Sequence, residues 1–171
     1  MCGMTGWLSY SQNLESQRET LQRMTDTMTL RGPDAEGLWI DGPVGLGHRR
    51  LSVIDLEGGR QPMMANYSGY RAAAVITYTG EVYNFQELRA ELQSLGHRFE
   101  TRSDTEVVLH SYLQWGNDFP EKLNGMYAFA IWDRLKQELF LVRDRMGVKP
   151  LYYFQTEDGI IFGSEPKALL A

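Results

Sequence analysis

The sequence Met-Tyr-Ala-Phe-Ala-Ile-Trp at residues 126–132 decides the fold class. It is the longest apolar run in the chain, and it is far shorter than the about 20 apolar residues that a membrane-spanning helix needs. A short run of this kind is typical of a buried strand. Strand-like segments continue on both sides of it, and we predict them at Gly3–Tyr10, Leu38–Ile40, Val44–His48, Ala72–Tyr78, Tyr127–Trp132, Glu138–Arg143, Leu151–Phe154 and Ile160–Phe162.

Three helices are predicted between these strands from capping signals. Ser16 and Glu19 form a capping box ahead of apolar residues at helical spacing, and this helix stops near Gly32. Asn84 opens a second helix that ends at Gly96, and 103–106 opens a third that ends at Gly116. Many short strands interrupted by three helices predict an α+β fold in which sheets pack on sheets or helices.

Composition describes one acidic domain. The 171 residues include 22 acidic and 17 basic ones, for a net charge of −5, and this length is enough for a sizeable core. The missing positive excess argues against general binding to nucleic acid or anionic membranes. No secretory signal is visible at the N-terminus, and we expect a cytoplasmic protein. The single cysteine excludes an internal disulfide, and the three scattered histidines predict no metal site.

The end of the chain carries one further signal. Ser164, Glu165 and Pro166 resemble the start of a helix, because proline is tolerated in the first turn. Only five residues follow Pro166, which is too few for a helix that is stable alone. A short terminal turn is one interpretation, and the one we favour is that the sequence continues in a longer protein.

The lone cysteine, Cys2, directly follows the initiator methionine. If Met1 is removed, Cys2 carries both a thiol and a free α-amine, and that amine can take the thiol proton as a built-in base. Cys2 as a small buried hydrophobic residue is an alternative. A conventional Cys–His pair with His48, His97 or His110 also stays open, although no local signature supports it.

Arg50, Glu81 and Asp104 are suited to a substrate with both an α-carboxylate and an α-ammonium. A guanidinium binds the first group in bidentate fashion, and carboxylates bind the second. Each residue has a simpler interpretation as a surface ion-pair member or a helix-dipole charge. Spacing alone does not place the three together.

Several motifs together identify a family resemblance. The chain has Met-Cys-Gly at its start and the following runs in order: Arg31-Gly-Pro-Asp34, His48-Arg-Arg-Leu-Ser-Val-Ile-Asp55, Gly80-Glu-Val-Tyr-Asn84, Ser103-Asp104, Leu123-Asn-Gly-Met-Tyr-Ala-Phe-Ala130, Arg143-Asp-Arg-Met-Gly-Val-Lys-Pro150 and Phe162-Gly-Ser-Glu165. They resemble the class II glutamine amidotransferase domain over nearly the whole chain. The segments 31–34 and 143–150 are similar to the asparagine synthetase branch.

The resemblance implies an N-terminal-nucleophile hydrolase fold, a four-layer αββα sandwich of two antiparallel sheets spanning residues 1–171. It implies that the domain hydrolyses the side-chain amide of L-glutamine through a Cys2 thioester. The ammonia would pass to a C-terminal synthetase domain in cis, which would use ATP and Mg²⁺, whereas this domain needs no cofactor. The resemblance leaves a homodimer open.

Residue roles follow from the resemblance in the same way. Cys2 would be the nucleophile, and the backbone N–H of Gly80 would donate to the oxyanion. Arg50 would bind the α-carboxylate of glutamine, with Glu81 and Asp104 on its α-ammonium. The backbone of Leu51, Ser52, Val53 and Ile54 would line the site.

Position 79 departs from the family pattern. The second oxyanion donor is usually an asparagine, and here it is Thr79, whose hydroxyl reaches less far than an amide. Losing one such donor costs on the order of 10²–10³ in rate. Thr79 therefore predicts a working but slower or partner-dependent glutaminase. Two other hypotheses are a non-catalytic glutamine-binding module and an N-terminal-nucleophile hydrolase of another amide.

Overall fold

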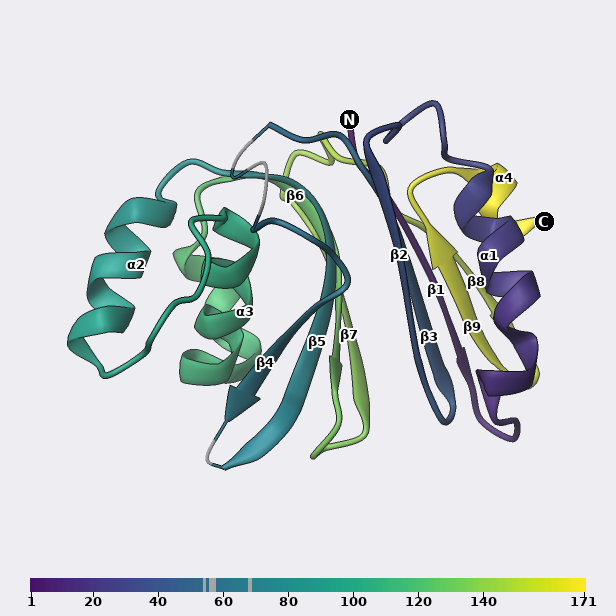
Figure 1. Ribbon diagram of the computed structural model, residues 1–171, viewed down its shortest axis with the longest axis horizontal. Coiled ribbons are helices and arrows are strands. Elements are labelled where there is room, and N and C mark those ends of the chain that lie inside the picture. Colours follow the sequence, from purple (N-terminus) through teal and green to yellow (C-terminus); the bar gives the residue numbers. More distant parts are fainter. Residues whose placement is uncertain (54, 56–57, 68) are drawn as a thin grey trace.

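Two antiparallel sheets face each other in the computed structural model, which describes residues 1–53, 55, 58–67 and 69–171. Helices cover the outer face of each sheet, so that the molecule has four layers in the order αββα (Figure 1). This arrangement is the αββα sandwich expected from the sequence. No helix in the described part of the chain is long and apolar enough to cross a membrane.

One sheet contains the N-terminal strand at its centre. Its order is β2 (Ala35–Asp41), β3 (Val44–Arg50), β1 (Gly3–Ser9), β9 (Gly159–Gly163) and β8 (Tyr152–Thr156). The order of the other sheet is β4 (Met63–Tyr67), β5 (Tyr70–Val82), β6 (Gly125–Asp133) and β7 (Glu138–Arg143). Figure 1 shows the N-terminus at one end of the two sheets, between them. Both sheets therefore contribute residues close to Cys2.

The helices lie on the outer faces. Figure 1 shows α1 (Arg18–Asp26) and α4 (Pro166–Leu169) on the sheet of β1, and α2 (Phe85–Ser94) and α3 (Asp104–Trp115) on the sheet of β5. Short 3-10 helices span Leu14–Gln17 and Gly116–Lys122. The predicted helix start at Pro166 is confirmed, with proline in the first turn of α4.

The helix caps agree with the sequence in one case and differ in two. Ser103 caps α3, and its Oγ accepts the Glu106 N–H at 3.3 Å. The expected Ser16 capping box is wrong, because Asn13 caps a 3-10 turn that starts earlier. Asn84 stands at the start of α2, but its side chain donates to the Lys122 carbonyl instead of capping. The side chain of Asn84 thus bonds to a residue far away in the sequence and not to a backbone N–H of its own helix.

The eight predicted strands all form, most of them longer than predicted. Only Glu138–Arg143 has the predicted bounds at both ends. Strand β4 was not predicted, because its sequence lacks a clear alternation of apolar and polar residues. It forms by pairing with β5, with Met63 opposite Ile76.

Strand β6 is buried, as its apolar sequence predicts, and the burial extends to both of its faces. Phe129 and Ile131 pack toward the helices, whereas Ala130 and Trp132 pack between the two sheets. Strand β5 alternates in the same way, since Ile76 joins the helix-side core and Val75 the inter-sheet core. Two cores therefore hold β5 rigidly from both sides.

Side chains complete the edge of β5 where β4 ends. Beyond Met63 no strand residue pairs with Tyr78 on that side within the described chain. The Tyr78 N–H donates to Gln61 Oε1 at 2.7 Å, and His48 Nε2 donates to the Tyr78 carbonyl at 3.0 Å. Both buried backbone groups of Tyr78 are thereby satisfied.

Candidate active site

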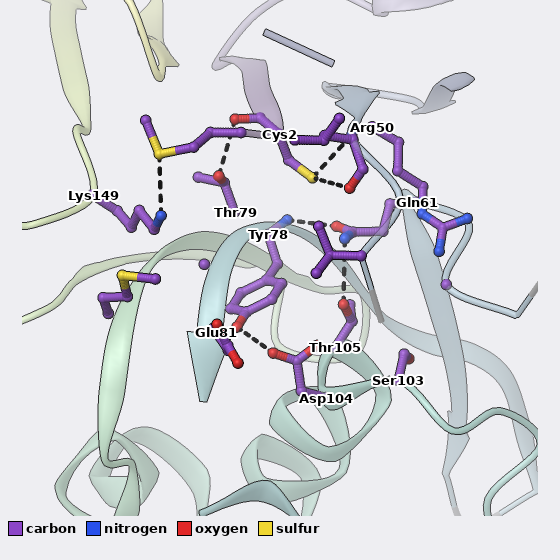
Figure 2. Close-up of a pocket in the computed structure, with 16 residues that line it drawn as sticks. Cys2, Arg50, Gln61, Tyr78, Thr79, Glu81, Ser103, Asp104, Thr105 and Lys149 are labelled. Atoms are coloured by element: carbon purple, nitrogen blue, oxygen red, sulfur yellow. Dashed lines mark hydrogen bonds between the residues drawn. The ribbon is translucent and has the colours of Figure 1, made fainter. Parts of the chain in front are cut away.

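A pocket of about 200 Å³ lies where the N-terminus, the end of β3, the end of β5 and the start of α3 meet (Figure 2). The residues that line it are Met1, Cys2, Arg50, Leu51, Val53, Gly59, Gln61, Tyr78, Thr79, Gly80, Glu81, Ser103, Asp104, Thr105, Met126 and Lys149. Its volume lies below the about 300–1,000 Å³ that is usual for drug-sized ligands. The pocket therefore suits a small metabolite.

The half-buried Cys2 is fixed at both its thiol and its carbonyl. Its Sγ accepts the Leu51 N–H at 3.3 Å and lies 3.4 Å from the Leu51 carbonyl oxygen. Its carbonyl accepts from Arg31 Nε at 2.8 Å and from Thr79 Oγ1 at 3.0 Å. These contacts come from three separate segments, so Cys2 is positioned by tertiary structure.

The Arg31–Asp34 motif supports the segment that follows β3. The Asp34 N–H donates to the Arg50 carbonyl at 2.9 Å, and the Asp34 carboxylate accepts the Ser52 N–H at 2.7 Å. Gly32 is required because a Cβ there would lie 2.3 Å from the carbonyl carbon of Arg49. The motif thus holds the backbone around Arg50.

Arg50 is 6% exposed, and its guanidinium donates to the carbonyl oxygen of Asp55. Gly59 lies so close that a Cβ on it would stand 2.5 Å from Arg50 Nη2. A buried guanidinium at the pocket wall is suited to a carboxylate, which it binds with paired hydrogen bonds.

Carboxylates lie on another side of the pocket. Asp104 is 5% exposed, and burial raises the pKa of its carboxyl group. Its Oδ2 accepts from Tyr78 Oη at 2.6 Å and from the Val82 N–H at 3.2 Å. Figure 2 shows Glu81 close to Tyr78 and Asp104, away from Arg50. The pocket therefore presents positive and negative charge on different walls.

Gly80 brings the backbone of β5 against β6. Its φ is +151°, and a Cβ at this position would lie 2.2 Å from the Met126 carbonyl oxygen. No side chain fits there, which leaves the backbone of Gly80 accessible to the pocket that it lines. The neighbouring Thr79 is 1% exposed and uses its hydroxyl proton on the Cys2 carbonyl.

The structure gathers most of the residues predicted for the site. Cys2, Arg50, Leu51, Val53, Thr79, Gly80, Glu81 and Asp104 all line the one pocket. Ser52 is not among the lining residues, and its N–H is bound by Asp34. Ile54 lies outside the described residues. The roles assigned to these residues stay predictions.

Sequence reasoning missed several residues of the site. Arg31 belongs to a noted motif, but nothing in the sequence places its Nε on the Cys2 carbonyl. Gln61 and Tyr78 carry no sequence signal, because their partners come from distant segments. Lys149 is 5% exposed and its Nζ lies 3.2 Å from the sulfur of Met1.

The histidines do not support a Cys–His pair. His48, His97 and His110 are not among the residues that line the pocket. Burial lowers the pKa of His48 to about 4, and its Nε2 is used by the Tyr78 carbonyl. His97, which follows α2, contacts His110 in the middle of α3. Among the described residues, no group of three or more His, Cys, Asp or Glu side chains is placed to hold a metal ion.

Known proteins are similar to this chain in sequence and in fold. The model of a family described as the glutamine amidotransferase domain matches residues 1–171. Asparagine synthetase (glutamine-hydrolyzing) 3 of Bacillus subtilis is 50% identical over 171 residues, which are 100% of this chain and 28% of that protein. Asparagine synthetase (glutamine-hydrolyzing) 2 of the same organism is 42% identical over 173 residues, which cover 100% of this chain and 22% of the relative.

A solved structure shows the same fold. The glutamine phosphoribosylpyrophosphate amidotransferase of Bacillus subtilis superposes with a TM-score of 0.80 at 21% identity, covering 98% of this chain and 43% of that one. The N-terminal-nucleophile hydrolase fold expected from the sequence is confirmed by this neighbour and by the two facing sheets. Because the family model matches all 171 residues, and all of them also align with an asparagine synthetase, the chain belongs to the glutamine amidotransferase domain family.

Proposed function

We propose that this domain hydrolyses the side-chain amide of L-glutamine to glutamate and ammonia. The observation that carries the proposal is the convergence of a thiol, a buried guanidinium and two carboxylates on one small pocket. Arg50 binds the α-carboxylate of glutamine, and Glu81 with Asp104 binds the α-ammonium. Charge complementarity then directs the amide toward Cys2 (Figure 2).

The reaction begins at the Cys2 thiol. With Met1 removed, the α-amine of Cys2 takes the thiol proton as the sulfur attacks the amide carbon. Negative charge develops on the amide oxygen, and this oxygen accepts a hydrogen bond from the backbone N–H of Gly80. The α-ammonium of Cys2 then gives this proton to the leaving nitrogen. Ammonia departs and leaves a γ-glutamyl thioester on Cys2. Water attacks the thioester carbon and releases glutamate and the free thiol.

Met1 blocks this mechanism while it is present. The peptide bond makes the Cys2 nitrogen a non-basic amide, and the Met1 ammonium is placed on the Arg31 carbonyl at 3.1 Å. The Met1 side chain also lines the pocket and contacts Lys149. The proposed active form therefore begins at Cys2.

Hydrolysis of another amide is less consistent with the site. A peptide substrate lacks the free α-ammonium for which Glu81 and Asp104 are suited, and the pocket of about 200 Å³ is small for a chain. A glutamine-binding module without catalysis would not need the fixed thiol of Cys2. Convergence of opposite charges beside that thiol favours the glutaminase.

The ammonia is used elsewhere in the proposed protein. The chain spans about a quarter of the length of the two asparagine synthetases described above, 28% and 22%. We infer that a synthetase region follows in cis and that ATP and Mg²⁺ act there to activate a carboxylate. A cytoplasmic location is proposed with it, because the nucleophilic thiol needs a reducing compartment. A homodimer stays a prediction.

Intact-mass measurement combined with a glutamate-release assay tests the proposal. The expected result is an active protein whose mass lacks Met1, and a Cys2→Ala variant that folds but releases no glutamate. Cys2→Ser is the matched control, because it replaces the thiol with a weaker hydroxyl nucleophile of similar size and is expected to retain only trace activity. Full activity with Met1 retained would refute the mechanism, and no glutamine hydrolysis by the processed protein would refute the function.

A further inference from the structure

Tyr78 lies behind the carboxylate of Asp104 at the floor of the pocket. Its hydroxyl donates to Asp104 Oδ2 at 2.6 Å (Figure 2). The Val82 N–H donates to the same oxygen at 3.2 Å. Two donors on one oxygen of a carboxylate fix the rotation of the whole group. Two donors on β5 therefore orient a carboxylate that is carried by α3.

Tyr78 is itself held rigidly. It is 3% exposed, and its ring packs on Phe129 with 6.4 Å between the ring centroids. Gln61 accepts its backbone N–H and His48 donates to its carbonyl, as described above. A hydroxyl on a side chain with fixed backbone and ring can position a partner within the narrow tolerance that binding sites need.

A second connection joins the same two elements. Gln61 Nε2 donates to Thr105 Oγ1 at 3.3 Å, and Thr105 follows Asp104 at the start of α3. Tyr78 is thus linked to α3 through its hydroxyl directly and through its backbone by way of Gln61. The start of α3 is anchored to β5 at both Asp104 and Thr105.

We propose that Tyr78 is the positioning residue of the ammonium site, holding the Asp104 carboxylate in the orientation that binds the α-ammonium of the substrate. This inference rests on the proposed glutaminase function. Tyr78 acts through Asp104, and its hydroxyl is already used by that carboxylate. Loss of the hydroxyl should therefore weaken glutamine binding while the chemistry at Cys2 continues.

The hydroxyl also favours the charged form of Asp104. Burial raises the pKa of Asp104, and the hydrogen bonds from Tyr78 and from the Val82 N–H oppose that rise. The pKa of Tyr78 is raised well above its ordinary value by burial, with Asp104, Glu81 and Cys2 as the charged groups that act on it. Tyr78 therefore stays a proton donor, and removing its hydroxyl raises the pKa of Asp104 further.

Tyr78→Phe removes the hydroxyl and keeps the ring. Binding of L-glutamine is measured by calorimetry in the Cys2→Ala background, where no turnover occurs. We expect the Kd to rise about tenfold, or about 1.4 kcal/mol of binding free energy, because the carboxylate loses the donor that orients it toward the ammonium. In the Cys2-intact protein, KM should rise with little change in kcat, and the acidic limb of kcat/KM should move to higher pH.

The chain offers a matched control in Tyr112. Its hydroxyl donates to Asp133 Oδ2 at 2.8 Å, and it is also 3% exposed, but it does not line the pocket. Tyr112→Phe should lower stability comparably and leave the Kd for glutamine within about twofold of the unmodified value. Glutaramate, which lacks the α-ammonium, is the second control, and Tyr78→Phe should change its inhibition constant by less than about twofold.

The outcomes separate the inference from the function beneath it. A rise in Kd for glutamine but not for glutaramate, seen only with Tyr78→Phe, supports the inference. Glutamine binding that is unchanged by Tyr78→Phe, or equal losses for both ligands, overturns the inference and leaves the glutaminase function standing. Absence of glutamine binding to the Cys2→Ala protein overturns the proposed function and this inference with it.

Discussion

Acid should destabilise this fold through His48, because its side chain is buried and water cannot hydrate the protonated imidazole. The imidazole is 1% exposed and donates to the Tyr78 carbonyl at 3.0 Å. Burial lowers its pKa from 6.5 to about 4; the hydrogen bond to the Tyr78 carbonyl opposes this shift, and the charge of Arg50 adds to it. The folded-state pKa lies below the unfolded one, so the unfolded chain binds the extra proton between pH 6.5 and about pH 4. Stability from this group is complete above that window and is lost as the pH falls through it.

The magnitude follows from the shift. A change from 6.5 to about 4 corresponds to about 3 kcal/mol once the pH is below both values. Between pH 7 and pH 5 the loss is about 2 kcal/mol. That is a large part of the about 5–15 kcal/mol that stabilises a typical domain.

Urea unfolding followed by tryptophan fluorescence at pH 7, 6 and 5 measures this loss, because the chain has four tryptophans. His48→Gln is the matched variant, since its amide can still donate to Tyr78 but does not titrate. The free energy of unfolding should fall about 2 kcal/mol more in the unmodified protein than in His48→Gln over that range. Parallel losses in the two proteins would show that His48 is not a buried neutral group and would refute the reasoning.

Three further changes test the site. Thr79→Asn should raise kcat about tenfold in a glutaminase assay, because it adds an amide donor beside Gly80, and an unchanged rate would show that the oxyanion is already fully stabilised. Gly80→Ala should cost more than about 3 kcal/mol in denaturant unfolding, because the new Cβ meets the Met126 carbonyl at 2.2 Å, and a stable variant would contradict the strand geometry. Asp34→Ala should raise KM for glutamine about fivefold with kcat nearly unchanged, because Ser52 loses its 2.7 Å partner and the backbone beside Arg50 loosens; an equal loss in kcat would argue instead for a role in chemistry.

Local signals in the sequence were sufficient for much of the fold. Ser103 caps its helix as predicted because the bonded N–H of Glu106 lies only three residues away. The apolar sequence of β6 indicated a buried strand, and both of its faces are buried. Strand β4 could not be found in this way, because its pairing with β5 decides its conformation. Asn84 misled for the same reason, since its partner is Lys122 in another segment.

The residues of the site also differ in whether the sequence alone could predict them. Cys2 and the charged residues of the site could be predicted from the sequence by residue type and motif, because the proposed reaction needs a thiol, a guanidinium and carboxylates. Their supporting contacts are not visible, because they join residues far apart in the chain. Arg31 reaches the Cys2 carbonyl across 29 positions, and Tyr78 reaches Asp104 across 26. Thr79 shows the limit most clearly, since its hydroxyl serves the backbone of Cys2 in the structure.

The place of β1 at the centre of its sheet has a consequence for biosynthesis. The strand that follows Cys2 lies between β3 and β9, and the Met4 N–H donates to Ser164 Oγ at 3.0 Å. A ribosome delivers residue 164 long after residue 4, so the strand that follows Cys2 waits for one neighbour until nearly all of these 171 residues have been made. Contacts of such long sequence separation also slow folding. The Cys2 thiol therefore reaches its final surroundings only when nearly the whole domain has emerged, so the pocket is completed late in the synthesis of this domain.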